Sequence, residues 1–294
     1  MHHDVIELRR FYYTRSLGRV AQRILRERLV TNWPVEQVTG MNIVGYGFAV
    51  PLLRPYLAQA RRVTGLMPGP QGVMAWPAGM ASHSVLCDET AWPLETGSID
   101  RLVMLHGLET SDHPSALLAE AWRALGPGGR MIIMVPNRAG LWARTDTTPF
   151  GFGRSYSAGQ LERQGEEAGF VTEKSGAAIY IPPSDRRFWL RGAMGWERLG
   201  NRIASVLVAG VTWAEFSKQV QSPVGPGRRL SVPSPLGVLE GLSRPRPAGG
   251  HVGGAVRGSL LGRGETGCET WGNHRLYRDH QVLAAIAGQG PDAS

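Results

Sequence analysis

Cysteine, lysine and long apolar runs are scarce in this sequence of 294 residues. The two cysteines, Cys87 and Cys268, lie far apart in unlike surroundings, which argues against a disulfide framework or a metal site. The longest apolar stretch, residues 203–213, is too short to cross a bilayer, and the N-terminus lacks the apolar core of a signal peptide. These absences predict a soluble, cytoplasmic protein without a metal and without a transmembrane segment.

Arginine carries nearly all of the positive charge. The 32 basic residues exceed the 24 acidic residues by eight, and only Lys174 and Lys218 are lysines. A bias this complete is typical of GC-rich coding, but the excess charge still attracts phosphates, acidic lipids and other anions. Nucleic acid or an anionic surface is therefore kept as an alternative partner, with weaker support than a small molecule.

Residues 1–40 predict an amphipathic, basic N-terminal helix. Asp4 and Glu7 are typical of a helix start, and apolar residues recur near helical spacing until Trp33 and Pro34 end the pattern. Such a helix could lie over a ligand pocket. Packing on the sheet edge with a solvated basic face is the preferred interpretation.

Strand and helix patterns alternate through residues 41–222. Apolar strands are predicted at 41–45, 61–67, 84–87, 99–105, 130–136, 172–181 and 211–220, and helices at 51–60, 114–125, 157–170 and 185–208. This alternation implies right-handed crossovers and a parallel sheet. The predicted fold class is α/β, with a doubly wound, mostly parallel, seven-stranded Rossmann-like sheet.

Two features of the C-terminal half complete the organisation. The helix at 185–208 has an arginine-rich arc and an apolar arc that includes Phe188 and Leu199, and the apolar arc is predicted to face the sheet. Residues 223–294 lose all periodicity, and the stretch 223–267 holds 12 glycines and 6 prolines. A tail of this composition is predicted to be disordered, and its abrupt start also suggests a shifted reading frame.

Two stretches carry a resemblance to a known family. Residues 87–109 read CDETAWPLETGSIDRLVMLHGLE, and residues 117–137 read LLAEAWRALGPGGRMIIMVPN. An acidic strand end, a Pro-Leu segment, a strand starting near Asp100 and a helix ending in L-x-P-G-G follow one another. This series resembles the class I methyltransferases of the type-11 domain family over residues 40–180. The resemblance implies S-adenosyl-L-methionine as cofactor and methyl transfer to an unidentified small-molecule acceptor.

The cofactor is expected at the carboxyl ends of the strands. Gly45, Tyr46 and Gly47 form the first strand-to-helix turn, where glycine lets a ligand approach the backbone or simply allows tight helix packing. The resemblance implies that Asp88, or Glu89 beside it, accepts a hydrogen bond from the adenine amino group. Capping of the next turn is the alternative role for these carboxylates.

Met67 stands where the resembling family has an acidic residue on the ribose hydroxyls, and the first motif also departs at Ile43 and Ala49. These departures leave open a catalytically silent, methyltransferase-like binding or regulatory domain. A nicotinamide-dependent oxidoreductase is less favoured because Val50 replaces the third glycine of that fingerprint.

Candidate acceptor residues lie on the second half of the sheet. His106, at the end of the strand 99–105, is a candidate base or a ring that packs under the sulfonium, with a purely structural role as the alternative. The long loop after Pro136 is predicted to be a substrate lid or a core plug. Its candidate substrate residues are Asn137, Arg138, Trp142 and Arg144.

Overall fold

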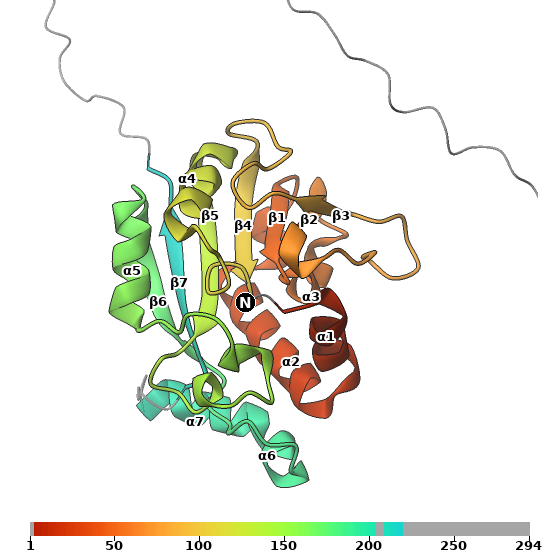
Figure 1. Cartoon of the computed structure of the whole chain (residues 1–294), viewed down its shortest axis with the longest axis vertical. Coiled ribbons are helices and arrows are strands. Elements are labelled where there is room, and N and C mark those ends of the chain that lie inside the picture. The colour runs from red at the N-terminus through yellow and green to blue at the C-terminus, as the bar shows by residue number, and fades with distance from the viewer. Residues whose placement is uncertain (1–2, 204–208, 220–294) are drawn as a thin grey trace, which may run out of the picture. The chain divides into compact units, whose positions relative to one another are not determined.

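The structure is a computed structural model that describes residues 3–203 and 209–219 (Figure 1). Seven strands within these ranges form one sheet: β1 Asn42–Gly47, β2 Arg62–Pro68, β3 Ser84–Cys87, β4 Ile99–Leu105, β5 Leu125–Pro136, β6 Val171–Ala178 and β7 Val211–Ser217. Their order is β3-β2-β1-β4-β5-β7-β6. The first five strands pair in parallel, whereas β7 runs antiparallel to both β5 and β6. The doubly wound, mostly parallel α/β fold is confirmed.

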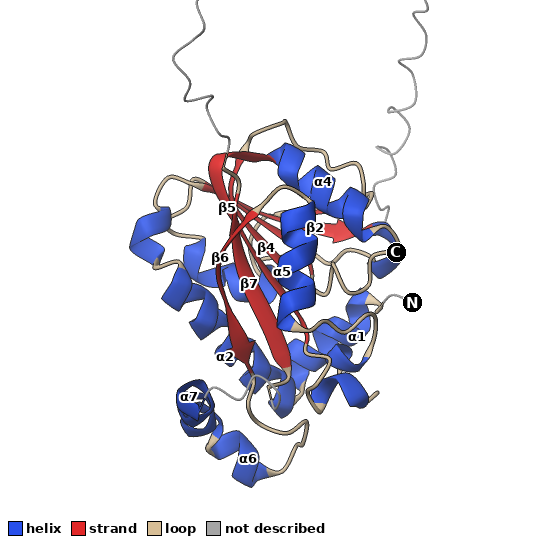
Figure 2. Cartoon of the chain, turned by 90° about the vertical axis from the view of Figure 1, so that its left-hand side faces the viewer, coloured by secondary structure: helices blue, strands red, loops and turns tan. Residues whose placement is uncertain are grey.

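Helices cover both faces of this sheet (Figures 1 and 2). The α-helices are α1 Val5–Arg9, α2 Ser16–Asn32, α3 Val50–Leu53, α4 Pro114–Ala124, α5 Ala158–Glu167, α6 Arg187–Arg191 and α7 Ala193–Ile203. A π-helix, η1, spans Arg10–Thr14. Short 3-10 turns lie at Val35–Val38, Arg54–Tyr56, Gly69–Gln71, Trp142–Arg144 and Pro149–Gly151.

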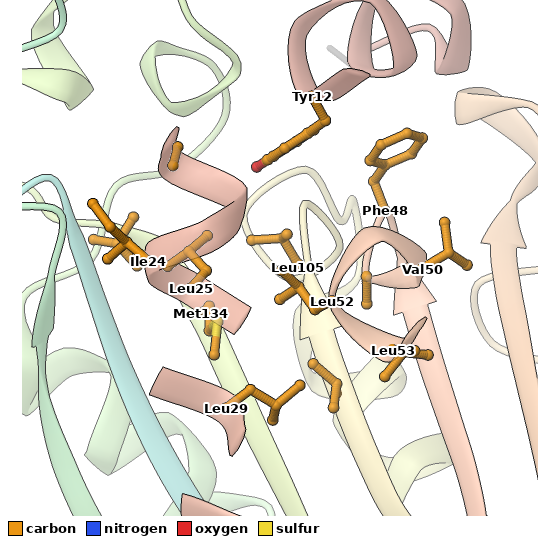
Figure 3. Close-up of a cluster of buried hydrophobic side chains, with 14 of the residues drawn as sticks. Tyr12, Ile24, Leu25, Leu29, Phe48, Val50, Leu52, Leu53, Leu105 and Met134 are labelled. Atoms are coloured by element: carbon orange, nitrogen blue, oxygen red, sulfur yellow. The ribbon is translucent and has the colours of Figure 1, made fainter. Parts of the chain in front are cut away.

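Alternating residues along the strands pack into two separate hydrophobic cores, one on each face of the sheet. On β1, Val44 and Tyr46 pack into the cluster that contains α4 and α5, while Ile43 packs into the cluster that contains α1, α2 and α3. This alternation is the period-2 pattern of a strand covered on both faces. Figure 3 shows the second cluster, where side chains of α2 and α3 meet Leu105 of β4 and Met134 of β5.

The N-terminal segment differs from the single helix expected over residues 1–40. α1 continues directly into η1, and the chain then breaks before α2 because Arg15 adopts an extended conformation (φ −76°, ψ 139°). At the bend, a Cβ on Gly18 would lie 1.9 Å from the carbonyl oxygen of Phe11, so only glycine permits this approach. Arg15 fixes the bend by donating to the Thr147 carbonyl and to the Asp185 carboxylate, at 2.7 and 2.8 Å.

The predicted orientation of the helix at 185–208 is wrong in part. The structure replaces this helix by α6 and α7, and the Phe188 and Leu199 side chains are 70% and 46% exposed. Instead, α7 buries Glu197, whose carboxylate accepts from the backbone amides of Ile179 and Tyr180 at 3.0 and 3.2 Å. Ile179 has a φ of 65°, and Glu197 satisfies the amides of this strained turn. The predictions for residues 204–208 and 223–294 lie outside the described residues.

Glu197 makes stability depend on pH. Burial raises the pKa of its carboxyl, although hydrogen bonds from Tyr180 and Ile179 and the charge of Arg28 lower it. A raised folded-state pKa means that the native protein binds this proton more tightly than the unfolded chain does. The resulting stabilisation is complete below the ordinary value of 4.5 and is lost as pH rises through the folded-state pKa.

We expect Glu197→Gln to remove this dependence, because the amide oxygen still accepts from the backbone but cannot ionise. In urea unfolding between pH 7.5 and pH 5, the native protein should gain free energy of unfolding relative to the Glu197→Gln variant as pH falls. The exposed Glu167→Gln change serves as the control. A difference between native protein and Glu197→Gln that stays constant across this range would contradict the prediction.

Candidate functional site

The parallel strands bring their carboxyl ends to one edge of the sheet. Strand order reverses between β1 and β4, which is where ligands bind in open α/β sheets. Gly47 lies opposite Leu105 across this point, and the Phe48 amide donates to the Leu105 carbonyl at 2.7 Å. The chain therefore passes directly from β1 over the end of β4.

Both glycines of the first turn are required by packing. A Cβ on Gly45 would lie 2.7 Å from Leu53 and 3.0 Å from Ala49, so this position lets α3 approach the sheet. Gly47 has a φ of 74°, and its Cβ would lie 2.5 Å from the carbonyl oxygen of Leu105. Their role in cofactor binding stays a prediction that rests on their backbone.

A buried chain of three polar side chains lies at this edge. The Tyr12 hydroxyl is 2.7 Å from Nε2 of His106, and Nδ1 of His106 is 3.0 Å from the Glu109 carboxylate. None of the three side chains is more than 2% exposed. His106 also has a φ of 52°, which is uncommon for a residue other than glycine. A segment from the N-terminal helices thus joins two residues of the turn after β4.

The hydrogen bonds assign roles within this chain. A carboxylate only accepts, so Nδ1 of His106 donates to Glu109, and in this tautomer Nε2 is the nitrogen that can accept from the Tyr12 hydroxyl. Burial, reinforced by the nearby charge of Glu109, raises the pKa of the Tyr12 hydroxyl well above its usual range, so Tyr12 keeps its proton. The arrangement leaves Nε2 as the group that could take up a proton if Tyr12 moved away.

Two further buried groups at this edge escaped the sequence analysis. Gln71, in the turn after β2, is 4% exposed, and neither polar atom of its amide has a hydrogen-bond partner in the part of the chain that the structure describes. The same holds for the second carboxylate oxygen of Glu109. Unpaired buried polar atoms cost about 1–3 kcal/mol each, so they point to a ligand or to water. A glutamine directly after the Pro-Gly-Pro end of β2 was the signal available in the sequence.

The N-terminal helices cover this edge. A Cβ on Gly72, next to Gln71, would lie 3.3 Å from Val5 of α1, and the Tyr12 ring stacks on Phe48 at 5.6 Å. Figure 3 shows Tyr12 and Phe48 facing each other beyond Leu105. The N-terminal helices therefore lie over the strand ends, and a ligand pocket beneath them stays a prediction.

The predicted adenine and ribose residues are not brought together by their side chains. Asp88 is exposed, and its carboxylate accepts from the Thr90 amide and hydroxyl at 2.8 and 2.9 Å; these bonds lower the pKa of the Asp88 carboxyl. Glu89 accepts from Ser111 and from the amide of residue 113. Met67 is fully buried, and its sulfur accepts from the Met74 amide at 3.5 Å. Turn capping, the alternative role, is what the structure shows for Asp88.

Tyr46 belongs to the opposite core. Its ring stacks on Trp92 at 5.0 Å and is 1% exposed. Burial raises the pKa of its hydroxyl far above the usual range. A contact of Tyr46 with a cofactor can therefore involve only its backbone.

The predicted substrate loop divides into buried and exposed residues. Trp142 is fully buried and donates to the Ile181 carbonyl at 2.7 Å, and Asn137 donates to the Ala209 carbonyl at 2.8 Å. Arg138 and Arg144 are exposed. Two of the four residues therefore hold the loop in place, and the two arginines are accessible to a ligand.

A pocket of about 490 Å³ lies beside the polar chain of Tyr12, His106 and Glu109. His3, Phe11, Thr148 and Phe152 are among the side chains that line it. The hydroxyl of Thr148 is buried and has no hydrogen-bond partner among the described residues. Phe150 connects the pocket to the polar chain, with its ring 4.8 Å from that of His106 and 6.4 Å from that of Phe11.

No helix among the described residues is long and apolar enough to cross a membrane. Residues 3–203 and 209–219 also contain no group of three or more histidine, cysteine, aspartate or glutamate side chains placed to hold a metal ion.

Comparison with known proteins identifies relatives of this arrangement. Residues 39–175 match a family model described as a methyltransferase domain. No curated protein matches the sequence. The fold is similar to a chain from the complex of the Haloferax volcanii Trm112 methyltransferase activator, with 16% identity, a TM-score of 0.53, and 73% of this chain and 95% of that chain covered.

Two S-adenosylmethionine-dependent methyltransferases are also similar. The protein from Thermotoga maritima has 18% identity and a TM-score of 0.49, with 73% of this chain and 96% of that chain covered. The protein from Archaeoglobus fulgidus has 14% identity and a TM-score of 0.49, with 72% and 98% covered. At these identities the likeness concerns the fold.

Proposed function

We propose that the protein binds S-adenosylmethionine and transfers its methyl group to a small-molecule acceptor. The match of residues 39–175 to a methyltransferase domain model supports this proposal. The observation that supports this most is the set of unpaired buried polar atoms at the strand ends, on Gln71 and Glu109. They lie at the edge where an open α/β sheet binds its ligand.

The residues at this edge suit the cofactor. The Gln71 amide, at the end of β2, can both donate and accept, as two ribose hydroxyls require. It would take the place of the acidic residue expected at Met67. The exposed carboxylate of Asp88, at the end of β3, remains the candidate acceptor for the adenine amino group. S-adenosylmethionine, when bound, supplies an activated methyl group that a nucleophile attacks in line.

The polar chain at the end of β4 would prepare the acceptor. Nε2 of His106 takes a proton from the acceptor once the Tyr12 hydroxyl is displaced, and Glu109 holds the imidazole through Nδ1. Phe11 and Phe152, which line the neighbouring pocket, offer apolar contact, and the Thr148 hydroxyl offers a hydrogen bond. Displacement of Tyr12 requires the N-terminal helices to move, because they cover this edge.

Calorimetry with S-adenosylmethionine and S-adenosylhomocysteine tests the proposal, and Gln71→Leu sharpens it. Leucine fills nearly the same space but removes both polar atoms. We expect affinity for both ligands to fall about tenfold, while the free energy of unfolding stays the same or rises by about 1 kcal/mol, because an unpaired amide is no longer buried. If Gln71 had only a structural role, Gln71→Leu would not lower the affinity for the two ligands while leaving the free energy of unfolding unchanged or higher.

Controls for this experiment come from the opposite edge of the sheet and from the β3 turn. Glu36→Ala, on an exposed residue before β1, should change neither quantity. Asp88→Asn keeps a neutral acceptor both for Thr90 and for the adenine amino group, so affinity should fall less in Asp88→Asn than in Asp88→Ala. Absence of binding heat with either ligand would contradict the proposed function.

A further inference from the structure

A second pocket lies on the other side of the N-terminal helices. Its volume is about 520 Å³, which is ordinary for a small-molecule site. It is bounded by α1, η1 and α2, by the start of α3, and by the loop after β2. Its lining residues are Arg9, Tyr13, Gln22, Arg26, Pro51, Arg54, Met74, Ala75, Trp76 and Ala78.

Three arginines from three different elements line this pocket. Arg9 comes from α1, Arg26 from α2 and Arg54 from the turn after α3. Burial raises the pKa of the Tyr13 hydroxyl in the same pocket, and the charges of Arg54, Arg26 and Arg9 each lower it. The charges of all three guanidinium groups therefore reach the Tyr13 hydroxyl, and the three groups lie close together in the pocket.

These arginines lack carboxylate partners within residues 3–203 and 209–219, where none of the three forms an ion pair. Other arginines of the N-terminal segment are paired, such as Arg15 with Asp185 and Arg23 with Glu27. Like charges held together without a counter-charge repel one another. Arg9 and Arg54 are exposed and Arg26 is half-buried, so a bound anion would reduce the repulsion among the three charges.

The remaining walls define the rest of the ligand. Trp76 is 4% exposed, and Met74 packs against the core, so one side of the pocket is apolar. The Gln22 side-chain amide donates a hydrogen bond to the Pro51 carbonyl oxygen at 3.0 Å, and this bond holds α2 against α3. An inorganic anion alone would leave most of the volume empty, so the ligand needs a body that lies over Met74 and Trp76.

We infer that this pocket binds a phosphate-bearing ligand, with Arg9, Arg26 and Arg54 around the phosphate and Met74 and Trp76 against its apolar body. A phosphate or diphosphate group matches three guanidinium groups in charge and in hydrogen-bond geometry better than a single carboxylate does. The phosphate comes from a soluble metabolite or from a lipid headgroup. This inference does not depend on methyl transfer.

Calorimetry with pyrophosphate, on the full chain at low and moderate salt, tests the site. We expect saturable binding that weakens as salt rises. Each of Arg9→Gln, Arg26→Gln and Arg54→Gln should weaken binding about tenfold, and the triple variant at least about a hundredfold. A charge-matched triple variant of the exposed residues Arg163, Arg187 and Arg198 should bind as the native protein does.

Sedimentation with phosphatidylglycerol vesicles separates the two sources of phosphate. If the protein binds vesicles through the three pocket arginines but does not bind pyrophosphate, the ligand is a lipid headgroup. If it binds pyrophosphate through these arginines but does not bind vesicles, the ligand is a soluble phosphate. Equal losses in the pocket triple and the control triple would mean that only net charge matters, and would overturn the inference. So would the absence of binding to both probes. Circular dichroism melting of each variant shows that the fold is retained.

Discussion

Replacing Trp142 by alanine is expected to lower the free energy of unfolding by about 3–5 kcal/mol, the usual cost of deleting a large buried aromatic side chain. Trp142 is fully buried, packs edge-on against Phe150 at 5.5 Å and donates to the Ile181 carbonyl. The backbone at Gly210 also lies against its ring, where a Cβ would be 2.5 Å from Cδ1. A thermal melt should shift down by about 6–20 °C.

Two neighbouring changes separate the causes of this loss. Leu141 is 51% exposed, so Leu141→Ala should cost no more than about 0.5 kcal/mol. Trp142→Phe keeps most of the apolar volume but leaves the Ile181 carbonyl without its donor, at a cost of about 1–3 kcal/mol. If Trp142→Ala were as mild as Leu141→Ala, the core role would be wrong, and the predicted contact with substrate would again be the better interpretation.

Gly47→Ala is expected to lower the free energy of unfolding by at least about 3 kcal/mol. Part of this cost is the left-handed backbone, with φ at 74°, which disfavours any residue with a Cβ by about 1–2 kcal/mol. The rest arises because the new methyl group would lie 2.5 Å from the Leu105 carbonyl oxygen and 2.8 Å from that of His106. These atoms belong to the backbone at the end of β4, which cannot shift without breaking the pairing of β1 with β4.

Gly40 provides a matched control for Gly47. Its φ is also 74°, but a Cβ there would meet nothing within 4 Å. Gly40→Ala therefore carries the backbone cost alone, and urea unfolding of the two variants measures the contact with β4 as a difference. Equal losses would show that the turn tolerates the methyl group, and that space above Gly47 is available to a ligand.

The structure changes the reason for the importance of Gly47. The resemblance to methyltransferases suggested that a side chain there would block the cofactor. The geometry shows that a side chain at Gly47 would clash with the backbone at the end of β4. Variants at Gly47 are therefore unsuitable as tests of cofactor binding, and Gln71→Leu is better because it leaves the backbone and the core volume unchanged.

The sequence by itself determined the architecture. Buried parallel strands are short and apolar, so the strand at 99–105 is found in the structure with the same bounds, and the helix expected at 114–125 ends one residue earlier. The resemblance to methyltransferases was also carried by the sequence, because it depends on the order of local patterns along the chain, and residues 39–175 match a methyltransferase domain model.

Only the tertiary structure decided which side chains form the candidate site. The polar chain joins Tyr12 to His106 across 94 residues of sequence, and no local pattern specifies such a contact. The unpaired amide of Gln71 and the three arginines from separate elements are likewise visible only when the chain is folded, because burial and missing partners are properties of three-dimensional neighbours. Periodicity in a sequence reports which face of an element is buried, whereas a binding site depends on what that face meets.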